Sequence, residues 1–269
     1  MNNIHAIILG LVQGATEFIP VSSSGHLVLV PWLFGWPNPS LAFYTVLHLG
    51  TLMAVLSVFW RDLLSLAGAW WKSVTKQQLD AAEARVAWWI AMGTIPAALM
   101  GILWEGQFEA LFHSPLHAAT LLLITGVWLA LAERHGRRER EPAELDGKES
   151  LLIGLAQGCA IAPGISRSGA TIGAGMLLGL RREAATRYSF LLAAPIIFGA
   201  GLLQVKRLLE LPDLGPSVAP LLLGFAAALA SGYACIRFLL SYVKERSLVV
   251  FAAYCWVVGL GAIAIYLLR

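Results

Sequence analysis

Charged residues are scarce in this chain. Asp, Glu, Lys and Arg make up 13% of its 269 residues, whereas soluble globular domains contain about 25%. Hydrophobic residues make up 58%, and the mean hydropathy is +0.72. This composition excludes an ordinary soluble domain, because too few charged groups are present to cover its surface. We therefore expect an integral membrane protein.

The chain has few cysteines, and its amino-terminal stretch has no Lys or Arg. The three cysteines, Cys159, Cys235 and Cys255, lie in apolar sequence without the spacing of a metal site. We expect inert buried thiols. The amino terminus has no basic region before its apolar stretch, so we expect no cleaved signal peptide. The net charge of +3 comes from basic residues that flank apolar runs, which favours membrane orientation over binding to nucleic acid.

Six apolar runs of about 17 to 23 residues are long enough to span a bilayer. They cover residues 41–60, 86–104, 116–132, 188–204, 218–240 and 248–268. Two further apolar regions are each divided into pieces of about 8 to 12 residues by a linker of Gly, Pro and Ser, and pieces that short predict re-entrant half-helices. The expected fold is all-α, with six transmembrane helices and two re-entrant hairpins.

The two divided regions repeat each other. Residues 10–25 correspond to residues 154–169, at a constant offset of 144 positions. Gly10, Gln13, Gly14, Ser22, Ser24 and Gly25 match Gly154, Gln157, Gly158, Ser166, Ser168 and Gly169, and farther along Tyr44 and Thr45 match Tyr188 and Ser189. We expect one membrane domain made of two halves, about 1–133 and 150–269, joined by a polar cytoplasmic loop, 134–149.

Basic residues predict how these halves are oriented. With a hairpin and three spans in each half, the second half is inverted, as in inverted-repeat membrane proteins. One side then receives Arg61, Lys72, Lys76, Arg85, Arg134, Arg137, Arg138, Arg140, Lys148, Arg181, Arg182, Arg187, Arg237, Lys244 and Arg246, and the other only Lys206, Arg207 and Arg269. The positive-inside rule places the first side in the cytoplasm. Both termini should lie outside, and the hairpin tips should meet near the midplane.

Two charged residues lie within the hairpins. Glu17 needs a partner or a water-filled cavity, because a carboxylate in hydrocarbon costs about 2.5 to 3.5 kcal/mol. Helical spacing would put Gln13 on the same face. Arg167 stands between Ser166 and Ser168, and its planar guanidinium could hold a phosphate through two hydrogen bonds. Glu17 is thus a metal ligand, a general base or the partner of Arg167 in a structural ion pair.

Residues 22–26 read Ser-Ser-Ser-Gly-His before a predicted half-helix, 27–34. Hydroxyls and free N–H groups at a helix start bind anions, although the serines could also serve as simple caps. A carboxylate beside an anion site suggests a divalent cation that bridges to phosphate oxygens. In a membrane the natural phosphate is a lipid head group. The residues alone therefore indicate a protein that binds or transforms a phosphorylated lipid.

In these residues the chain resembles the undecaprenyl-pyrophosphate phosphatase family, the bacitracin-resistance type of bacterial inner membranes. The resemblance covers nearly the full length and is carried by two motifs, Gln13, Gly14, Thr16, Glu17, Phe18, Pro20, Ser22, Ser23, Gly25 and His26, and Pro163, Gly164, Ser166, Arg167, Ser168, Gly169, Ala170 and Thr171. It implies hydrolysis of undecaprenyl pyrophosphate to the monophosphate carrier lipid of cell-wall peptidoglycan synthesis. It also implies dependence on Mg²⁺ or Ca²⁺ and a site open to the periplasm or outer leaflet. Many members have Glu at the position of Gln13, which makes Gln13 a weak metal ligand and leaves more of that role to Glu17.

The residues and the resemblance together assign roles. The predicted catalytic residues are Glu17, Ser23, His26 and Arg167, and the predicted substrate-binding residues are Ser22, Ser24, Gly25, Ser166, Ser168, Gly169 and Thr171. The attacking group stays open among Ser23 activated by His26 or Glu17, His26 itself, and a metal-bound water. His48 is interpreted as a packing residue or as lining the cavity. The alternative function is a polyprenyl-phosphate transporter or flippase with the same anion site; a homodimer is left open.

Overall fold

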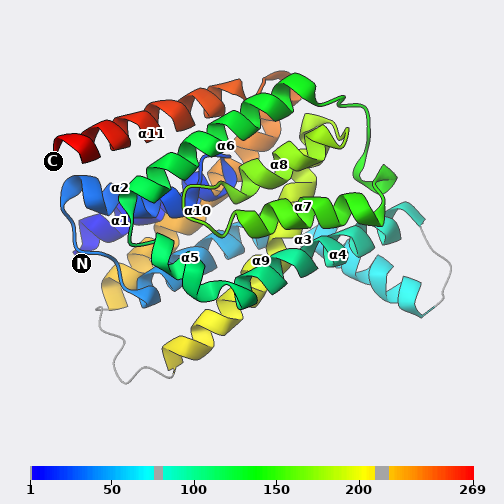
Figure 1. The fold of residues 1–269 in the computed structure, drawn as a ribbon. Coiled ribbons are helices and arrows are strands. Elements are labelled where there is room, and N and C mark those ends of the chain that lie inside the picture. Colours follow the sequence, from blue (N-terminus) through cyan, green and yellow to red (C-terminus); the bar gives the residue numbers. More distant parts are fainter. Residues whose placement is uncertain (1, 76–80, 210–217) are drawn as a thin grey trace.

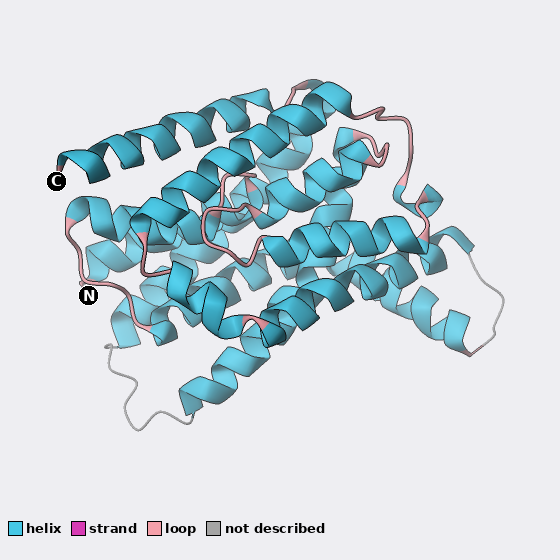
Figure 2. Ribbon diagram, in the orientation of Figure 1, coloured by secondary structure: helices cyan, strands magenta, loops and turns pink. Residues whose placement is uncertain are grey.

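The structure, a computed structural model, describes residues 2–75, 81–209 and 218–269. Regular structure in these ranges is helical, apart from one isolated β-bridge between Arg140 and Leu180 (Figure 2). The helices are α1 Asn3–Phe18, α2 Ser23–Phe34, α3 Leu41–Val74, α4 Ala81–Leu103, α5 Glu105–Leu111, α6 Pro115–His135, the 3₁₀ helix η1 Pro142–Glu144, α7 Gly147–Cys159, α8 Arg167–Leu177, α9 Arg182–Leu209, α10 Val218–Glu245 and α11 Val249–Leu268. Among the described residues, α3, α4, α6, α9, α10 and α11 are long and apolar enough to span a membrane, which confirms the six expected spans.

The helix ends differ from the predicted ones in ways that have local causes. Helix α3 continues to Val74, well past the predicted end at residue 60. The charged Arg61 and Asp62 end the apolar run in the sequence, but the Leu and Ala residues that follow favour helix, so the helix continues beyond them. Helix α2 begins at Ser23, four residues before the predicted start. The cause is the side chain of Ser22, whose Oγ accepts a hydrogen bond from the backbone N–H of Gly25 at 3.2 Å and so caps the first turn.

Two pairs of short helices interrupt the long ones. Helices α2 and α8 have 12 and 11 residues, so at 1.5 Å per residue each is only about 16 to 18 Å long, against a hydrocarbon core of about 30 Å. The chain turns between α1 and α2 after Pro20, and between α7 and α8 at Gly164. Gly164 has a φ of +106°, and a Cβ there would overlap the carbonyl oxygen of Ala118. The two turns meet in the middle of the molecule (Figure 2).

Each half packs its first short helix against a long helix of the other half. Helix α1 lies along α10, and α7 lies along α4; α3 lies against α9, and α6 against α11 (Figure 1). Small residues permit the close approach: a Cβ at Gly10 would overlap the backbone of α10 at Gly224, and one at Gly154 would overlap the backbone of α4 at Gly93. Gly10 and Gly154, which match each other in the repeat, thus serve equivalent packing contacts in the two halves.

The chain ends and the polar linker lie at opposite ends of the molecule. Both termini are at one end, and the segment between α6 and α7 is at the other (Figure 1). Arg140 anchors this segment, because its guanidinium donates to Glu149 at 2.7 and 2.9 Å and to the carbonyl of Leu178 at 2.9 Å. Lys76, one of the basic residues assigned to the cytoplasmic side, lies outside the described residues.

The prediction of buried thiols is correct for one cysteine and wrong for another. All three are free; Cys255 is buried, Cys235 is half-buried and Cys159 is exposed. Apolar sequence suits a lipid-facing position as well as a protein core, so hydropathy could not distinguish the outward face of α7 from a buried one.

Candidate active site

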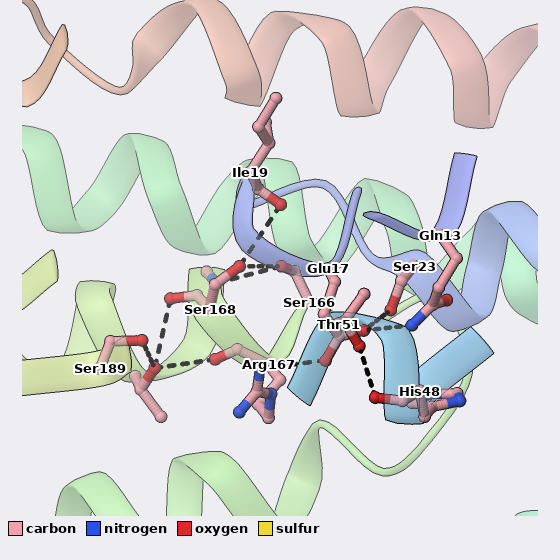
Figure 3. Close-up of polar contacts among 12 residues, drawn as sticks. Gln13, Glu17, Ile19, Ser23, His48, Thr51, Ser166, Arg167, Ser168 and Ser189 are labelled. Atoms are coloured by element: carbon pink, nitrogen blue, oxygen red, sulfur yellow. Dashed lines mark hydrogen bonds and ion pairs between the residues drawn. The ribbon is translucent and has the colours of Figure 1, made fainter. Parts of the chain in front are cut away.

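Glu17 is the centre of a polar cluster inside the molecule. It lies in the last turn of α1 and is 6% exposed. Its Oε1 accepts a hydrogen bond from Nη2 of Arg167 at 3.0 Å. Its Oε2 accepts from Nε2 of Gln13 at 2.9 Å and from the hydroxyl of Ser23 at 2.5 Å (Figure 3). The predicted contact between Gln13 and Glu17 on one helix face is confirmed, and one carboxylate joins the two hairpins.

The contact with Glu17 engages only one of the two terminal nitrogens of Arg167. It is the first residue of α8, and its side chain is 16% exposed. Its Nη1 is buried and has no hydrogen-bond partner among the described residues, and neither does Oε1 of Gln13. Buried polar atoms are nearly always paired, so these two atoms mark a place where a polar ligand would complete the site. The expected ion pair between Glu17 and Arg167 therefore exists and still leaves a donor for an anion.

Ser22 links the two hairpin tips. Besides capping α2, its Oγ accepts from the N–H of Gly164 at 3.1 Å and lies 3.3 Å from the carbonyl of Ile165, to which it donates. The backbone of Ser22 has a φ of +69°, a conformation uncommon outside glycine. This serine is thus held in an unfavourable conformation by contacts across 142 positions of sequence.

Ser166 is the counterpart of Ser22 and caps α8. Its Oγ accepts from the N–H of Gly169 at 3.0 Å and lies 3.2 Å from the hydroxyl of Ser168. The N–H groups of Gly25 and Gly169, both predicted to bind phosphate, are therefore already bonded to these serine caps. Ser22 and Ser166 therefore act as helix caps in this structure.

The remaining predicted hydroxyls are bonded to other groups of the protein, and one of them connects the two hairpins. Ser168 donates to the carbonyl of Ile19 at 3.3 Å, which connects α8 to the first turn. The hydroxyl of Thr171 donates to the carbonyl of Arg167 at 2.9 Å and lies 2.6 Å from that of Ser189 (Figure 3). Ser24 is partly exposed beside Ser22, with the two hydroxyl oxygens 3.4 Å apart. Their contacts with phosphate stay predictions.

Both ring nitrogens of His26 face partners other than Glu17, one of them on α11. Its Nδ1 lies 2.8 Å from the carbonyl oxygen of Ser22, and its Nε2 lies 2.9 Å from the hydroxyl of Tyr254. The imidazole is 6% exposed. Of the two bases considered for Ser23, the structure brings Glu17 into contact with it and turns both nitrogens of His26 to other partners.

Sequence reasoning missed several residues that shape the site. Thr125 of α6 accepts from the N–H of Ser166 at 3.0 Å and donates to the carbonyl of Gly164 at 2.9 Å, so it sets the shape of the second turn. Neither Thr125 nor Tyr254 lies in the matching segments 10–25 and 154–169, and no local sequence signal marks either residue. His48 lies in α3 beside the cluster (Figure 3), and its Nδ1 is 2.9 Å from the carbonyl oxygen of Tyr44. The packing and cavity-lining interpretations of His48 both stay predictions.

The donors in the cluster fit a hard divalent cation better than a soft one. The carboxylate of Glu17, the unpartnered Oε1 of Gln13 and the hydroxyl of Ser23 are all oxygen donors, which are the ligands of Mg²⁺ and Ca²⁺. The described residues contain no group of three or more His, Cys, Asp and Glu side chains arranged for a metal. A cation here would therefore take further ligands from a phosphate and water, which is usual for Mg²⁺.

Known proteins resemble this chain over nearly its whole length. The family described as "Bacitracin resistance protein BacA" matches residues 6–261. Proteins named undecaprenyl-diphosphatase from Desulforudis audaxviator and Moorella thermoacetica are 43% and 41% identical over 269 residues, with 100% of each chain covered. One of the same name from Methanosphaera stadtmanae is 43% identical over 267 residues, 96% of this chain and 95% of the relative. With six apolar helices of membrane-spanning length in the part of the chain that the structure describes, the chain is a multi-pass membrane protein, and it belongs to the bacitracin resistance protein BacA family.

Proposed function

We propose that this protein is an undecaprenyl-diphosphatase, which hydrolyses undecaprenyl pyrophosphate to undecaprenyl phosphate and inorganic phosphate and so recycles the carrier lipid for cell-wall synthesis. Relatives that match the whole chain carry this name. The observation that carries the proposal is the position of Glu17 between a hydroxyl, Ser23, and a guanidinium, Arg167, inside a membrane protein. These are the groups that phosphoryl transfer requires for attack and charge neutralisation.

Ser23 is the proposed nucleophile and Glu17 its base. The proton of the Ser23 hydroxyl passes to Oε2 of Glu17, 2.5 Å away, while Oγ forms a bond to the terminal phosphorus. The anhydride bond breaks, and undecaprenyl phosphate leaves. Water then attacks the phosphoserine and releases inorganic phosphate, and a proton returns to the serine oxygen. A carboxylate in hydrogen-bond contact with the hydroxyl supplies the activation that a serine lacks at its free pKa.

Arg167 is the proposed phosphate clamp. Nη2 stays on Glu17, and the unpaired Nη1 is available to an oxygen of the terminal phosphate. A preorganised donor of this kind stabilises charge that develops in the transition state without reorganisation. The same residue thereby positions the substrate relative to Ser23 through the carboxylate that both contact.

A divalent cation, Mg²⁺ or Ca²⁺, is the proposed cofactor. Glu17 and Oε1 of Gln13 are the groups that would hold it, and it would neutralise charge on the pyrophosphate. Gln13 supplies no charge of its own, so the cation would depend mainly on Glu17.

The proposed setting is an inner membrane, with α1–α2 and α7–α8 as inverted re-entrant hairpins and the site open to the periplasm or outer leaflet. The reciprocal packing of α1 on α10 and α7 on α4 supports the inverted repeat. The position of both termini opposite the linker supports the orientation (Figure 1). A Lys148→Cys variant should react only with reagents that cross the membrane, and tags on both termini should be labelled from outside. Termini on opposite sides would contradict the inverted repeat.

Release of inorganic phosphate from undecaprenyl pyrophosphate by the purified protein tests the activity itself. The protein in detergent with Mg²⁺ or Ca²⁺ should release one phosphate per lipid, and Glu17→Gln should not. Movement of polyprenyl phosphate across liposomes without hydrolysis would instead identify a transporter.

A further inference from the structure

His26 forms a pair with Tyr254, and the steps proposed above assign neither residue a role. They lie 228 positions apart, on α2 and α11, with the phenol oxygen 2.9 Å from Nε2. Their rings are stacked, with centroids 5.7 Å apart and planes inclined by 15°. His26 is 6% exposed, whereas Tyr254 is 43% exposed. The phenol therefore stands between the buried imidazole and the outer face of α11.

The hydrogen bonds of His26 define which nitrogen carries its proton. Nδ1 faces the carbonyl oxygen of Ser22 at 2.8 Å, and a carbonyl can only accept, so Nδ1 must donate. A neutral imidazole has one N–H, so Nε2 then carries a lone pair and accepts the O–H of Tyr254. Ser22 and Tyr254 thus select one tautomer and one ring orientation.

We propose that Tyr254 is a positioning residue for His26, which holds the imidazole in the Nδ1–H tautomer with its Nε2 lone pair directed to the α11 side of the site. For the catalytic consequence the proposal rests on the diphosphatase function above. Ser23 is left to Glu17; His26 follows Ser23 by three residues on α2, so its ring lies beside the reacting groups in the orientation that the phenol sets. Loss of the hydroxyl would leave a buried lone pair unpaired and free the ring to turn.

Tyr254→Phe tests this, with Tyr266→Phe as the matched control. Tyr266 lies on the same helix, is also 43% exposed and has its ring 6.0 Å from that of Trp32, away from His26. With undecaprenyl pyrophosphate as substrate, Tyr254→Phe should lower kcat about ten-fold, the order expected for one hydrogen bond to a positioned group, and leave KM within about two-fold. Tyr266→Phe should change neither.

Two further measurements separate positioning from a general effect on the fold. In a His26→Gln background, Tyr254→Phe should have no further effect on kcat, because residues that act through one another are not additive. In protein labelled with ¹⁵N-histidine, the His26 signals, assigned by their loss in His26→Gln, should show an unprotonated Nε2 that shifts in Tyr254→Phe and not in Tyr266→Phe.

Equal kcat for the two Phe variants, a full ten-fold loss in the His26→Gln background, or an Nε2 signal that does not respond to Tyr254→Phe would each overturn the proposal. The ¹⁵N measurement needs no turnover. If the wild type fails to hydrolyse the lipid, the diphosphatase function is wrong, while the histidine signals still decide whether Tyr254 sets the tautomer.

Discussion

The hydroxyl oxygen of Ser23 lies 2.5 Å from Oε2 of Glu17, across the turn between α1 and α2. A separation this short is typical of a hydroxyl that donates to a charged carboxylate. The turn after Pro20 thus brings the carboxylate at the end of α1 into contact with the hydroxyl at the start of α2.

Ser23→Ala should abolish phosphate release, with a loss of about three orders of magnitude or more, because it removes the proposed nucleophile. The variant should still bind undecaprenyl pyrophosphate, since Arg167 and Glu17 remain. Phosphate release and lipid binding by the purified protein measure both. Ser57→Ala, which removes an exposed hydroxyl on α3, is the control for folding. An active Ser23→Ala enzyme with phosphate trapped on His26 would move the attack to the imidazole.

Arg167→Lys should lower turnover about 10² to 10³-fold, the usual cost of removing one preorganised donor. Lysine keeps the positive charge beside Glu17 but cannot contact the carboxylate and a phosphate at once through a planar fork. The melting temperature in detergent should stay close to that of the wild type, and phosphate release gives the rate. Turnover near the normal value would mean that Arg167 contributes only diffuse charge.

Gln13→Glu should make the protein more dependent on a divalent cation. The substitution replaces the hydrogen bond from Nε2 to Glu17 by a second carboxylate, which repels Glu17 unless a cation with oxygen ligands lies between them. Chelation with EDTA should therefore lower the melting temperature of the variant more than that of the wild type, and Mg²⁺ or Ca²⁺ should restore it. If EDTA leaves both proteins equally stable and active, the cation is not held here.

Ser22→Ala should destabilise the protein by about 1 to 3 kcal/mol, because the N–H of Gly164 would be buried without an acceptor. Alanine would also keep the strained positive φ of this position without the contacts that hold it. Thermal unfolding followed by circular dichroism should show a lower melting temperature, again with Ser57→Ala as reference. Unchanged melting would show that the hairpin tips do not depend on this link.

The linker should contribute less to stability in acid. Hydrogen bonds from the Arg140 guanidinium hold the pKa of Glu149 below its ordinary value of 4.5. Because the folded pKa is the lower one, the contribution is complete above the unfolded value and is lost as the pH falls through the folded one. Glu149→Gln should therefore melt below the wild type at pH 7, and the two melting temperatures should converge as the pH falls below the folded pKa. Glu183→Gln, at a half-exposed ion pair with Lys244, should show little difference at either pH; a gap for Glu149→Gln that is constant with pH would contradict the prediction.

Local chemistry made a good part of the site predictable. Gln13 and Glu17 are four residues apart on a helix, so their contact follows from helical geometry. Ser22 and Ser166 occupy cap positions whose residue preference is strong, and the repeat identified both. Thr125 and Tyr254 could not be found this way, because each meets its partner through the packing of α6 or α11 on a distant hairpin.

By itself, the sequence determined that the chain is an all-helical membrane protein with six apolar spans and two broken, repeated segments, because each feature depends on residues close together in the chain. Only the tertiary structure decided which groups share Glu17, that Ser23 and not His26 contacts it, and that Arg167 reaches it from 150 positions away. These contacts depend on how each helix is rotated against its neighbours. For α1 and α7 the close backbone contacts at Gly10 and Gly154 constrain that rotation, and no periodicity in the sequence identifies their partners in α10 and α4.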